Sequence, residues 1–493
     1  MSLLEQSRWE GRLYAGAWRD ASTTLAVVEP ATGHTLARAG AATAADVETS
    51  VAVAVEVQRA WAAAPYLERS RVLRRAAQLF VEYADEIGEW VARDAGQVIT
   101  AARNQGPNAA EECFQAAELA SMPYGEILRS AQPRLSLSRR LPVGVVGVIA
   151  PFNSPITLAV RSLAPALALG NAVILKPDPR TAVAGGVVFA RIFEEAGLPA
   201  GLLHVLPGGA EVGEALVTHP RVPVLAFTGS TEAGRAIGVE AARRLKRVHL
   251  ELGGNSALIV LDDVDVSAAV AAGAAATFRH QGQICMATGR HLVHASVADE
   301  YAAGLSELAA AMPVGDPMSA RSALGPLIDE RQRDRVHALV TASVDAGARL
   351  ATGGSFEGLF YRPTVLTGVD DATPAYAQEV FGPVAPVRAF HDLDEAVRLA
   401  ADSPYGLSLG ILTRDVMRGL ALAERVPTGL VHINDQTIND EPVIPFGGLG
   451  DSGNGARHGG HAANLEAFTE QQWVTVRGDV PLYPNPTKKK AQA

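Results

Sequence analysis

Hydrophobic and polar residues follow two different periods along the chain. Between about Ala45 and Asp94, apolar residues recur at the three- and four-residue spacing of helices, and a second helical region is predicted from about Ala109 to Ala120. Residues Arg134–Leu141 instead alternate with a period of two, which indicates a strand with two different faces. Because this strand lies between helical or buried stretches, we expect it to project as a ribbon.

From Val143 onward, short apolar strands alternate with helices. Strands are predicted at 143–150, 172–176, 203–206, 224–227 and 247–251, with helices at 155–168, 182–196, 212–218 and 232–245. A second cycle begins with a strand at 257–261 and a helix at 266–278, and it continues to about Ile433. This alternation predicts an α/β protein with parallel sheets covered by helices.

The last part of the chain contains a strand, Gln472–Arg477, without a nearby partner in the sequence. We expect this strand to pair across a subunit boundary with the ribbon at Arg134–Leu141, because exposed strand edges tend to find partners. Residues Pro484–Ala493, with three consecutive lysines, are expected to form a frayed tail.

Length and composition narrow the possible classes of function. The chain has 493 residues, enough for two or three domains, and its net charge of −10 argues against a nucleic-acid-binding surface. Two cysteines exclude a disulfide framework and favour a reducing cytosol. The polar residues 1–18 lack the apolar core of a secretory signal, and prolines interrupt the longest apolar run, Val143–Val160. We therefore expect a cytoplasmic protein without a membrane segment. Its histidines show no zinc-binding spacing, so no metal is expected.

One of the two cysteines, Cys285, follows the polar segment Gln281-Gly282-Gln283, which is an unlikely core environment. A thiol can instead be a structural group in the core, and we assign that role to Cys113. Upstream of Cys285, Glu251 ends a predicted strand and precedes Gly253 and Gly254. A thiolate nucleophile with a carboxylate base is a familiar catalytic pair, so we expect the fold to bring Cys285 and Glu251 together.

Three predicted strands end in segments suited to a phosphate or ribose. The turn at Gly229 joins a strand to a helix, Lys176 ends another strand, and Gly209 follows a third. Each signal is weak by itself, since Gly229 also suits an ordinary tight turn and a single lysine is usually a surface group. Ligands of parallel sheets bind beyond the carboxyl ends of the strands, so the three together favour a dinucleotide. At another strand end, the side-chain amide of Asn153 can donate to a developing oxyanion or can support a turn beside proline.

These motifs, in this order, resemble the NAD(P)-dependent aldehyde dehydrogenase superfamily over essentially the whole chain. The matching segments are Pro151-Phe152-Asn153, Leu175-Lys176-Pro177, Phe227-Thr228-Gly229-Ser230, Glu251-Leu252-Gly253-Gly254-Asn255, Gln281-Gly282-Gln283-Ile284-Cys285, Glu379-Val380-Phe381-Gly382-Pro383 and Pro445-Phe446-Gly447-Gly448.

The resemblance implies a role for each matching residue. Cys285 would be the nucleophile, Glu251 the general base, and Asn153 the oxyanion donor together with the Cys285 backbone amide. The residues implied around the cofactor are Phe152, Lys176, Gly209, Gly213, Phe227, Gly229, Ser230, Leu252, Glu379 and Phe381. The implied fold has a Rossmann-type nucleotide-binding domain (1–122 and 142–252), a catalytic domain (253–445), and a β-ribbon oligomerisation arm with a C-terminal tail (123–141 and 446–493). A homodimer or homotetramer is expected.

One departure from the family pattern concerns the cofactor, and one likeness within the family concerns the substrate. Many NAD-preferring relatives carry a glutamate three residues after the lysine, where this chain has Pro179, so we favour NAD but expect that NADP is possible. The strings Leu175–Thr181 and Ile433–Thr437 look most like the benzaldehyde and vanillin dehydrogenase type. Arg161 is expected either to contact a substituent on an aromatic ring or to form a salt bridge; the other candidate substrate contacts are Ile284, Met286 and Phe446.

The resemblance implies oxidation of an aldehyde to its acid. The thiolate would attack the carbonyl carbon, hydride would pass to the nicotinamide, and water activated by Glu251 would hydrolyse the thioester. The alternatives are an aliphatic aldehyde or semialdehyde substrate, transfer of the acyl group to coenzyme A, and a non-catalytic nucleotide-binding protein. The presence of Glu251 argues against the coenzyme A reaction, and the set of Asn153, Glu251 and Cys285 argues against the non-catalytic protein.

Overall fold

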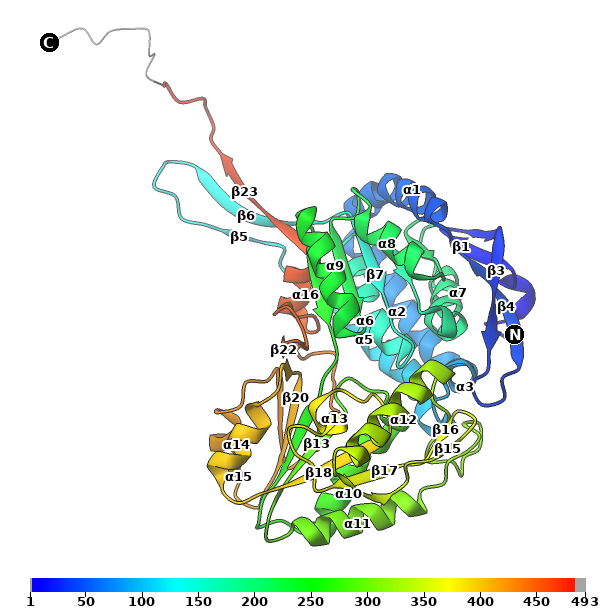
Figure 1. Cartoon of the computed structure of the whole chain (residues 1–493). Helices are drawn as coiled ribbons and strands as arrows, with labels where there is room; N and C mark the ends of the chain where they lie inside the picture. The colour runs from blue at the N-terminus through cyan, green and yellow to red at the C-terminus, as the bar shows by residue number, and fades with distance from the viewer. Residues whose placement is uncertain (1, 484–493) are drawn as a thin grey trace, which may run out of the picture.

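The computed structural model describes residues 2–483, and the predicted lysine-containing tail lies outside them. The chain forms two α/β units, each built around a seven-stranded sheet, and a narrow arm that projects from the first unit (Figure 1). Within the described residues, no helix is long and apolar enough to cross a membrane.

The first sheet has the strand order β11-β10-β7-β8-β9-β1-β2. Five of its strands are parallel, and an antiparallel hairpin, β1–β2, extends one edge. Its strands are β1 (Arg12–Ala15), β2 (Trp18–Asp20), β7 (Val145–Ile149), β8 (Ala172–Lys176), β9 (Leu203–Val205), β10 (Val224–Thr228) and β11 (Arg247–Glu251). In chain order, β8 and β9 are added on one side of β7, and β10 and β11 are then added on its other side. The strand order therefore reverses between β7 and β10, where a crevice for a ligand is expected.

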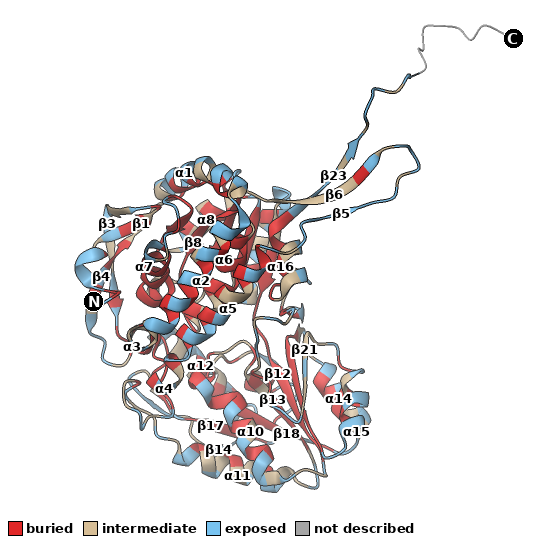
Figure 2. Cartoon of the chain, turned by 180° about the vertical axis from the view of Figure 1, so that it is seen from behind, coloured by how far each residue is buried: buried red, intermediate tan, exposed pale blue. Residues whose placement is uncertain are grey.

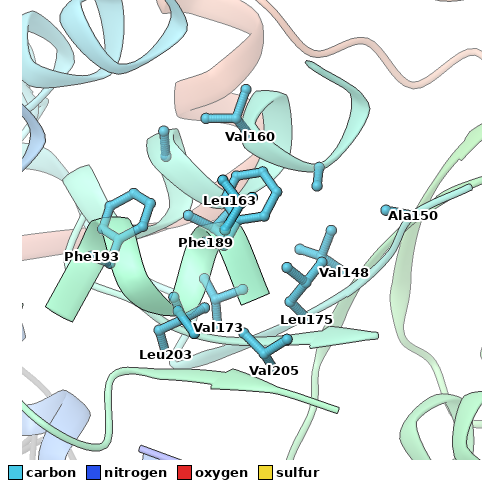
Figure 3. Packing of buried hydrophobic residues seen from close by; sticks show 14 of the residues in the cluster. Val148, Ala150, Val160, Leu163, Val173, Leu175, Phe189, Phe193, Leu203 and Val205 are labelled. Carbon is cyan, nitrogen blue, oxygen red and sulfur yellow. The ribbon is translucent and has the colours of Figure 1, made fainter. Parts of the chain in front are cut away.

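Helices cover both faces of this sheet, and the interior between them is apolar. The buried strands β7 and β8 are rich in valine and isoleucine, as strands covered on both faces usually are. Figure 3 shows Phe189 and Phe193 packing with side chains from β8, β9 and α6, and Figure 2 shows that the elements inside this unit are mostly buried. The surrounding elements are β3 (Thr23–Val28), β4 (Thr35–Ala41), α1 (Ala44–Ala63), α2 (Tyr66–Glu82), α3 (Ala84–Ala95), α4 (Ile99–Ala102), α5 (Gln105–Leu119), α6 (Pro155–Ala168), α7 (Val188–Glu195), α8 (Ala210–Thr218), α9 (Thr231–Arg243) and α16 (His461–Phe468).

The second sheet has the order β14-β17-β18-β13-β12-β20-β21 and is parallel apart from β14. Its strands are β12 (Ser256–Val260), β13 (Thr288–His294), β14 (Arg349–Thr352), β17 (Thr364–Thr367), β18 (Val384–Phe390), β20 (Ser408–Leu412) and β21 (Leu430–Ile433). The helices of this unit are α10 (Val266–Phe278), α11 (Ala298–Ala311), α12 (Glu330–Asp345), α13 (Pro374–Ala377), α14 (Leu393–Ala401) and α15 (Val416–Ala423). Two short strand pairs complete the fold: β15 (Phe356–Glu357) with β16 (Phe360–Tyr361), and β19 (Tyr405–Gly406) with β22 (Leu449–Gly450).

The arm is a three-stranded antiparallel sheet in the order β23-β6-β5. Its strands are β5 (Gly125–Ile127), β6 (Leu135–Pro142) and β23 (Thr469–Val476), and they extend away from the first unit in Figure 1. The predicted pairing of the late strand with the ribbon is confirmed, but the expected subunit boundary is wrong. Strand β23 pairs with β6 of the same chain over eight residue pairs, from Thr469 opposite Pro142 to Val476 opposite Leu135. The chain returns through α16 to the base of the ribbon, which makes the local pairing possible.

The predicted α/β architecture and its strand and helix order from residue 143 onward are confirmed. The structure adds the N-terminal strands β1–β4, which the sequence pattern did not indicate. It also divides the predicted helix 182–196 into a π-helical stretch, Val183–Val187, followed by α7. The division into domains at residues 252 and 445 stays a prediction.

Candidate active site

A cleft of about 420 Å³ lies beyond the carboxyl ends of β7, β8 and β10, and we call it the strand-end cleft. It is bounded on the other side by residues of the second unit. Among the predicted site residues, the lining includes Phe152, Asn153, Lys176, Phe227, Gly229, Ser230, Leu252, Cys285, Glu379 and Phe381. The ends of β7, β8 and β10 and the cysteine therefore meet at one cavity. The sequence predicts this for Lys176 and Gly229, whereas Gly209, which follows β9, is not among the lining residues.

At two positions on the rim of this cleft the neighbouring side chains leave no space for any residue larger than glycine. A Cβ atom on Gly229 would lie 2.5 Å from the ring of Phe227, and one on Gly253 would lie 2.3 Å from Oε2 of Glu379. The turn at Gly229 leads into α9, whose first turn is capped by Ser230 accepting from the backbone N–H of Ala233. Backbone amides at a helix start attract phosphate, so the glycine turn fits the pyrophosphate of a dinucleotide.

Two charged side chains near this turn have partners within the protein. Burial lowers the pKa of Lys176, whose Nζ donates to the Pro177 carbonyl at 3.4 Å. Asp178, beside the substituted Pro179, accepts from the backbone N–H and both the Nε and Nη2 of Arg180 at 2.8–2.9 Å. The adjacent acid therefore does not present a free charge to the cleft.

Two further residues of the second unit shape the cleft. Glu379 accepts from the Gly254 backbone N–H at 3.0 Å, and burial raises its pKa to about 7. Phe381 adopts a positive φ of 53° and meets Phe152 edge-on, with 6.0 Å between ring centroids. A carboxylate at this position can accept from ribose hydroxyls.

The segment before Cys285 has an unusual backbone. His280, Gln281 and Gly282 all have positive φ, so the chain makes a left-handed turn after α10. The expectation that the glutamines mark a non-core environment is wrong, because Gln281 and Gln283 are fully buried. Each side-chain amide has backbone partners on one side: Gln281 donates to the carbonyls of Gly96 and Pro326, and Gln283 accepts from the N–H of Ile328. The Oε1 of Gln281 and the Nε2 of Gln283 have no partner among the described residues. The backbone bonds fix the loop that presents the half-buried Cys285 to the cleft.

Asn153 is placed by the junction between β7 and α6. Pro155 at the first position of α6 suits a helix start, and the amide of Asn153 donates to the Gln283 carbonyl at 2.9 Å. This bond holds the Asn153 amide against the backbone of Gln283, which is two residues before Cys285 in the chain. A primary amide has two N–H donors, so one remains for an oxygen bound at the sulfur.

Burial changes the ionisation of the two candidate reacting groups. It raises the pKa of Cys285 to about 12, with additional contributions from the charges of Glu379 and Glu251. It also raises the pKa of Glu251 to about 8, although Arg161 and Arg457 act in the opposite direction. Both groups are therefore mostly protonated at neutral pH in this state. A carboxyl group with a pKa near 8 is well matched to proton transfer close to neutral pH.

An apolar cluster surrounds Cys285 on one side. It comprises Ile284, Met286, Ala287, Leu407, Leu430, Ile438, Ile444 and Phe446. The guanidinium of Arg161 lies 4.5 Å from the centre of the Phe446 ring. Arg161 is only 2% exposed and forms ion pairs with Glu112 and Asp440, which agrees with the salt-bridge alternative. One of its nitrogens, Nη1, has no hydrogen-bond partner among the described residues.

Some predicted residues lie near the strand-end cleft without lining it. Gly213 lies beside the Lys176 side chain, since its Cβ would be 3.9 Å from Cδ of that lysine, and Gly209 precedes α8. Glu251 ends β11 next to Leu252, which does line the cleft. The second cysteine, Cys113, is fully buried in the first core, as predicted. Among residues 2–483, no group of three or more potential ligands could hold a metal ion.

The structure also brings in residues that the sequence did not indicate. Arg180 stacks on Phe152 at 4.4 Å and forms an ion pair with Asp329 of the second unit at 2.6 Å. Arg335 donates to the backbone carbonyl of Glu379 at 2.9 Å. The sequence around these arginines does not indicate that they contact a ligand. They are identified as residues of the cleft only by their position in the structure.

Comparisons with known proteins agree with this geometry. The model of the aldehyde dehydrogenase family matches residues 18–474. A vanillin dehydrogenase of Amycolatopsis sp. is 61% identical over 485 residues, covering 98% of this chain and all of that protein. The NAD+ benzaldehyde dehydrogenase of Pseudomonas putida is 48% identical, covering 97% of this chain and 99% of that one. The solved structure of Staphylococcus aureus betaine aldehyde dehydrogenase with NAD+ superposes with a TM-score of 0.94 at 28% identity, covering 98% of each chain. The chain belongs to the aldehyde dehydrogenase family.

Proposed function

We propose that this protein oxidises aromatic aldehydes, of the benzaldehyde or hydroxybenzaldehyde type, to carboxylic acids with a nicotinamide dinucleotide as oxidant. The observation that carries the proposal is the placement of Cys285 at the meeting point of two surfaces. The strand-end cleft with its glycine turns lies on one side, and the apolar cluster lies on the other. When bound in the cleft, the dinucleotide supplies a hydride acceptor.

In this proposal, Cys285 attacks the carbonyl carbon to form a thiohemiacetal. The second N–H of Asn153 and the Cys285 backbone amide hold the negative oxygen, and such a donor contributes about 3 kcal/mol to the transition state. The amide of Asn153 is already fixed by Gln283, so no reorganisation is needed when the charge develops. Because the resting sulfur is a thiol, its proton passes to a water molecule in the cleft as the carbon–sulfur bond forms.

Loss of hydride from the thiohemiacetal leaves a thioester on Cys285, and Glu251 is the proposed base for its hydrolysis. The carboxylate takes a proton from water, and the resulting hydroxide attacks the acyl carbon. Its Oε2 is buried without a hydrogen-bond partner among the described residues, which suits an atom that binds a transient water. Sulfur leaves as the thiolate and takes the proton back from Glu251, which restores the thiol and the carboxylate, and the acid product is released.

The aromatic preference is supported by the side chains around the sulfur. Phe446 and Ile438 are buried, as is Met286, and together they offer apolar surface for a ring. The free nitrogen of Arg161 is a proposed donor to an oxygen substituent on that ring. The names of the relatives from Amycolatopsis sp. and Pseudomonas putida point to the same substrate class. An aliphatic aldehyde is the alternative.

For the cofactor we propose NAD, with NADP also accepted. The glutamate that would grip the ribose and repel a 2′-phosphate is replaced by Pro179, and Arg180 neutralises the neighbouring Asp178. We place the reaction in the cytoplasm, because both cysteines are free thiols, as in a reducing compartment.

A comparison of initial rates tests the substrate and cofactor together. Benzaldehyde, hydroxylated benzaldehydes and straight-chain aldehydes are each assayed with NAD and with NADP. We expect kcat/KM for the aromatic aldehydes to exceed that for hexanal by about tenfold or more, because one extra well-packed apolar group changes binding by roughly 1–3 kcal/mol. Faster oxidation of hexanal than of every aromatic aldehyde would refute the aromatic assignment.

We further propose that the arm mediates assembly into a homodimer or homotetramer. Ile127 is 83% exposed and Trp473 is 63% exposed on a sheet that projects from the molecule. Replacing Ile127 with Asp is expected to shift the protein to smaller species at micromolar concentration, because a charge replaces apolar contact area. Analytical ultracentrifugation measures this shift, with Glu126→Gln on the same strand as the control. An Ile127→Asp protein with unchanged assembly would contradict a role for this face.

A further inference from the structure

We propose that His458 is a positioning residue for Glu251: it donates its Nε2–H to Oε1 of the ionised carboxylate and leaves Oε2 to receive the proton from water. This inference rests on the proposed role of Glu251 in thioester hydrolysis. The two side chains face each other with 3.8 Å between Nε2 and Oε1, and both are at least 95% buried. This distance is longer than a hydrogen bond, and in the proposal the bond forms when the ionised carboxylate turns toward Nε2.

The backbone holds the two residues in this arrangement. The loop after Gly450 runs along the end of β11, where Gly453 forms a bridge with Glu251 and the Leu252 N–H donates to the Ser452 carbonyl at 3.0 Å. A second bridge joins His458 to Phe446, with the Phe446 N–H donating to the His458 carbonyl at 2.9 Å. The imidazole is therefore fixed at the carboxylate by bonds that do not involve its own side chain.

The rings of His458 and Phe446 are neighbours in a tilted arrangement, with 31° between their planes and 6.4 Å between their centroids. Phe446 also belongs to the apolar cluster around Cys285. The imidazole thus lies between the candidate substrate surface and the candidate base. Its other nitrogen, Nδ1, has no partner among residues 2–483, so no other group competes for the orientation of the ring.

The charges around the pair favour a neutral imidazole. Burial, Arg161 and His249 hold the pKa of His458 well below its usual range. Arg161 on α6, together with Arg457 beside the histidine, also faces Glu251, and the charges of Glu251 and Glu379 both bear on Cys285. A neutral histidine can donate one N–H to the carboxylate without adding a third positive charge between the two arginines.

In this geometry one carboxylate oxygen, Oε1, accepts the stabilising hydrogen bond, and the other, Oε2, is left to accept the proton from water. Ionised Glu251 is costly in a buried site, and a directed donor to Oε1 stabilises the charge while fixing the plane of the carboxylate. Oε2 then stays oriented toward the acyl carbon. Without the imidazole, the ionised form becomes rarer at neutral pH and less well oriented. Attack of the thiol and departure of hydride do not require this donor.

The test uses the full-length protein with NAD and benzaldehyde at pH 6–10. His458→Phe keeps an aromatic ring against Phe446 but removes the donor, and His458→Leu removes it without a ring. The fraction of protein carrying an acyl group on Cys285 at steady state is measured by mass spectrometry after acid quench, and stopped-flow absorbance gives the first-turnover rate of NADH formation.

We expect both variants to show hydrolysis about tenfold slower at pH 7, with its pH midpoint about one unit higher, and a larger acylated fraction. The first-turnover rate should change less than twofold. His458→Gln, which restores an amide donor, should recover part of the shift. As a matched control, His204→Phe removes a buried imidazole on β9, four strands from β11, and should leave the midpoint unchanged.

An unchanged midpoint and acylated fraction in His458→Phe and His458→Leu would overturn the inference. Equal loss of first-turnover rate and hydrolysis would also overturn it, because it would indicate a general structural role. Failure of the proposed function has a different signature: the unmodified protein would then form no acyl group on Cys285 at all. The two results are distinguishable in the same experiment.

Discussion

Replacing Cys285 with alanine is expected to lower kcat for aldehyde oxidation by about four orders of magnitude or more, while the dissociation constant for NAD changes little. Removal of a nucleophile that acts together with a base usually has an effect of this size, because no other group can form the covalent intermediate. The groups that fit the dinucleotide, including Lys176, Glu379 and the Gly229 turn, are not altered. Steady-state absorbance at 340 nm and titration of protein fluorescence with NAD measure the two quantities.

The chain provides its own control for this experiment. Cys113→Ala removes the second thiol, which is fully buried in the core of the first unit on α5. This variant should keep its kcat and lose some stability, since a buried side chain becomes smaller. Normal turnover by Cys285→Ala would end the assignment of Cys285 as nucleophile. Loss of activity in both variants together with loss of the folded state would point to packing instead.

Much of this fold follows from local patterns in the sequence. Strands such as β7 and β8 are continuous apolar runs bounded by glycine or proline, and the pattern places α6 at its observed bounds because Pro155 marks its start. Convergence at the strand-end cleft follows from general topology: the carboxyl ends of parallel strands share one edge. Cys285 and the turn at Gly229 could therefore be assigned to one site before their contacts were known.

Tertiary pairings could not be predicted in the same way. The partner of β23 lies more than 300 residues away, and nothing in the strand itself distinguishes a partner in the same chain from one in a second subunit. Gln281 and Gln283 look like surface residues, yet each is buried and bonds through its side-chain amide to backbone groups of distant segments. The approach of His458 to Glu251 also depends on two isolated backbone bridges, which leave no periodic signal.

Replacing Glu251 with glutamine is expected to separate the two halves of the reaction. Glutamine keeps the shape of the side chain but cannot accept a proton, so hydride transfer in the first turnover should persist while thioester hydrolysis slows by about 100-fold or more. Rapid mixing with NAD and benzaldehyde should therefore give one equivalent of NADH per site, followed by a slow steady state. Glu232→Gln, which removes an exposed carboxylate on α9, should show neither effect.

The pH dependence of hydrolysis gives this experiment a second, independent readout. Burial raises the pKa of Glu251 to about 8, and the base acts only when ionised. Hydrolysis by the unmodified protein should therefore rise about tenfold per pH unit well below pH 8 and level off above it. In Glu251→Gln the plateau should vanish, because hydroxide from solution then attacks the thioester and its concentration keeps rising with pH. The same plateau near pH 8 in both proteins would assign the titration to another group, and an unchanged steady-state rate at pH 7 would remove Glu251 from the role of base.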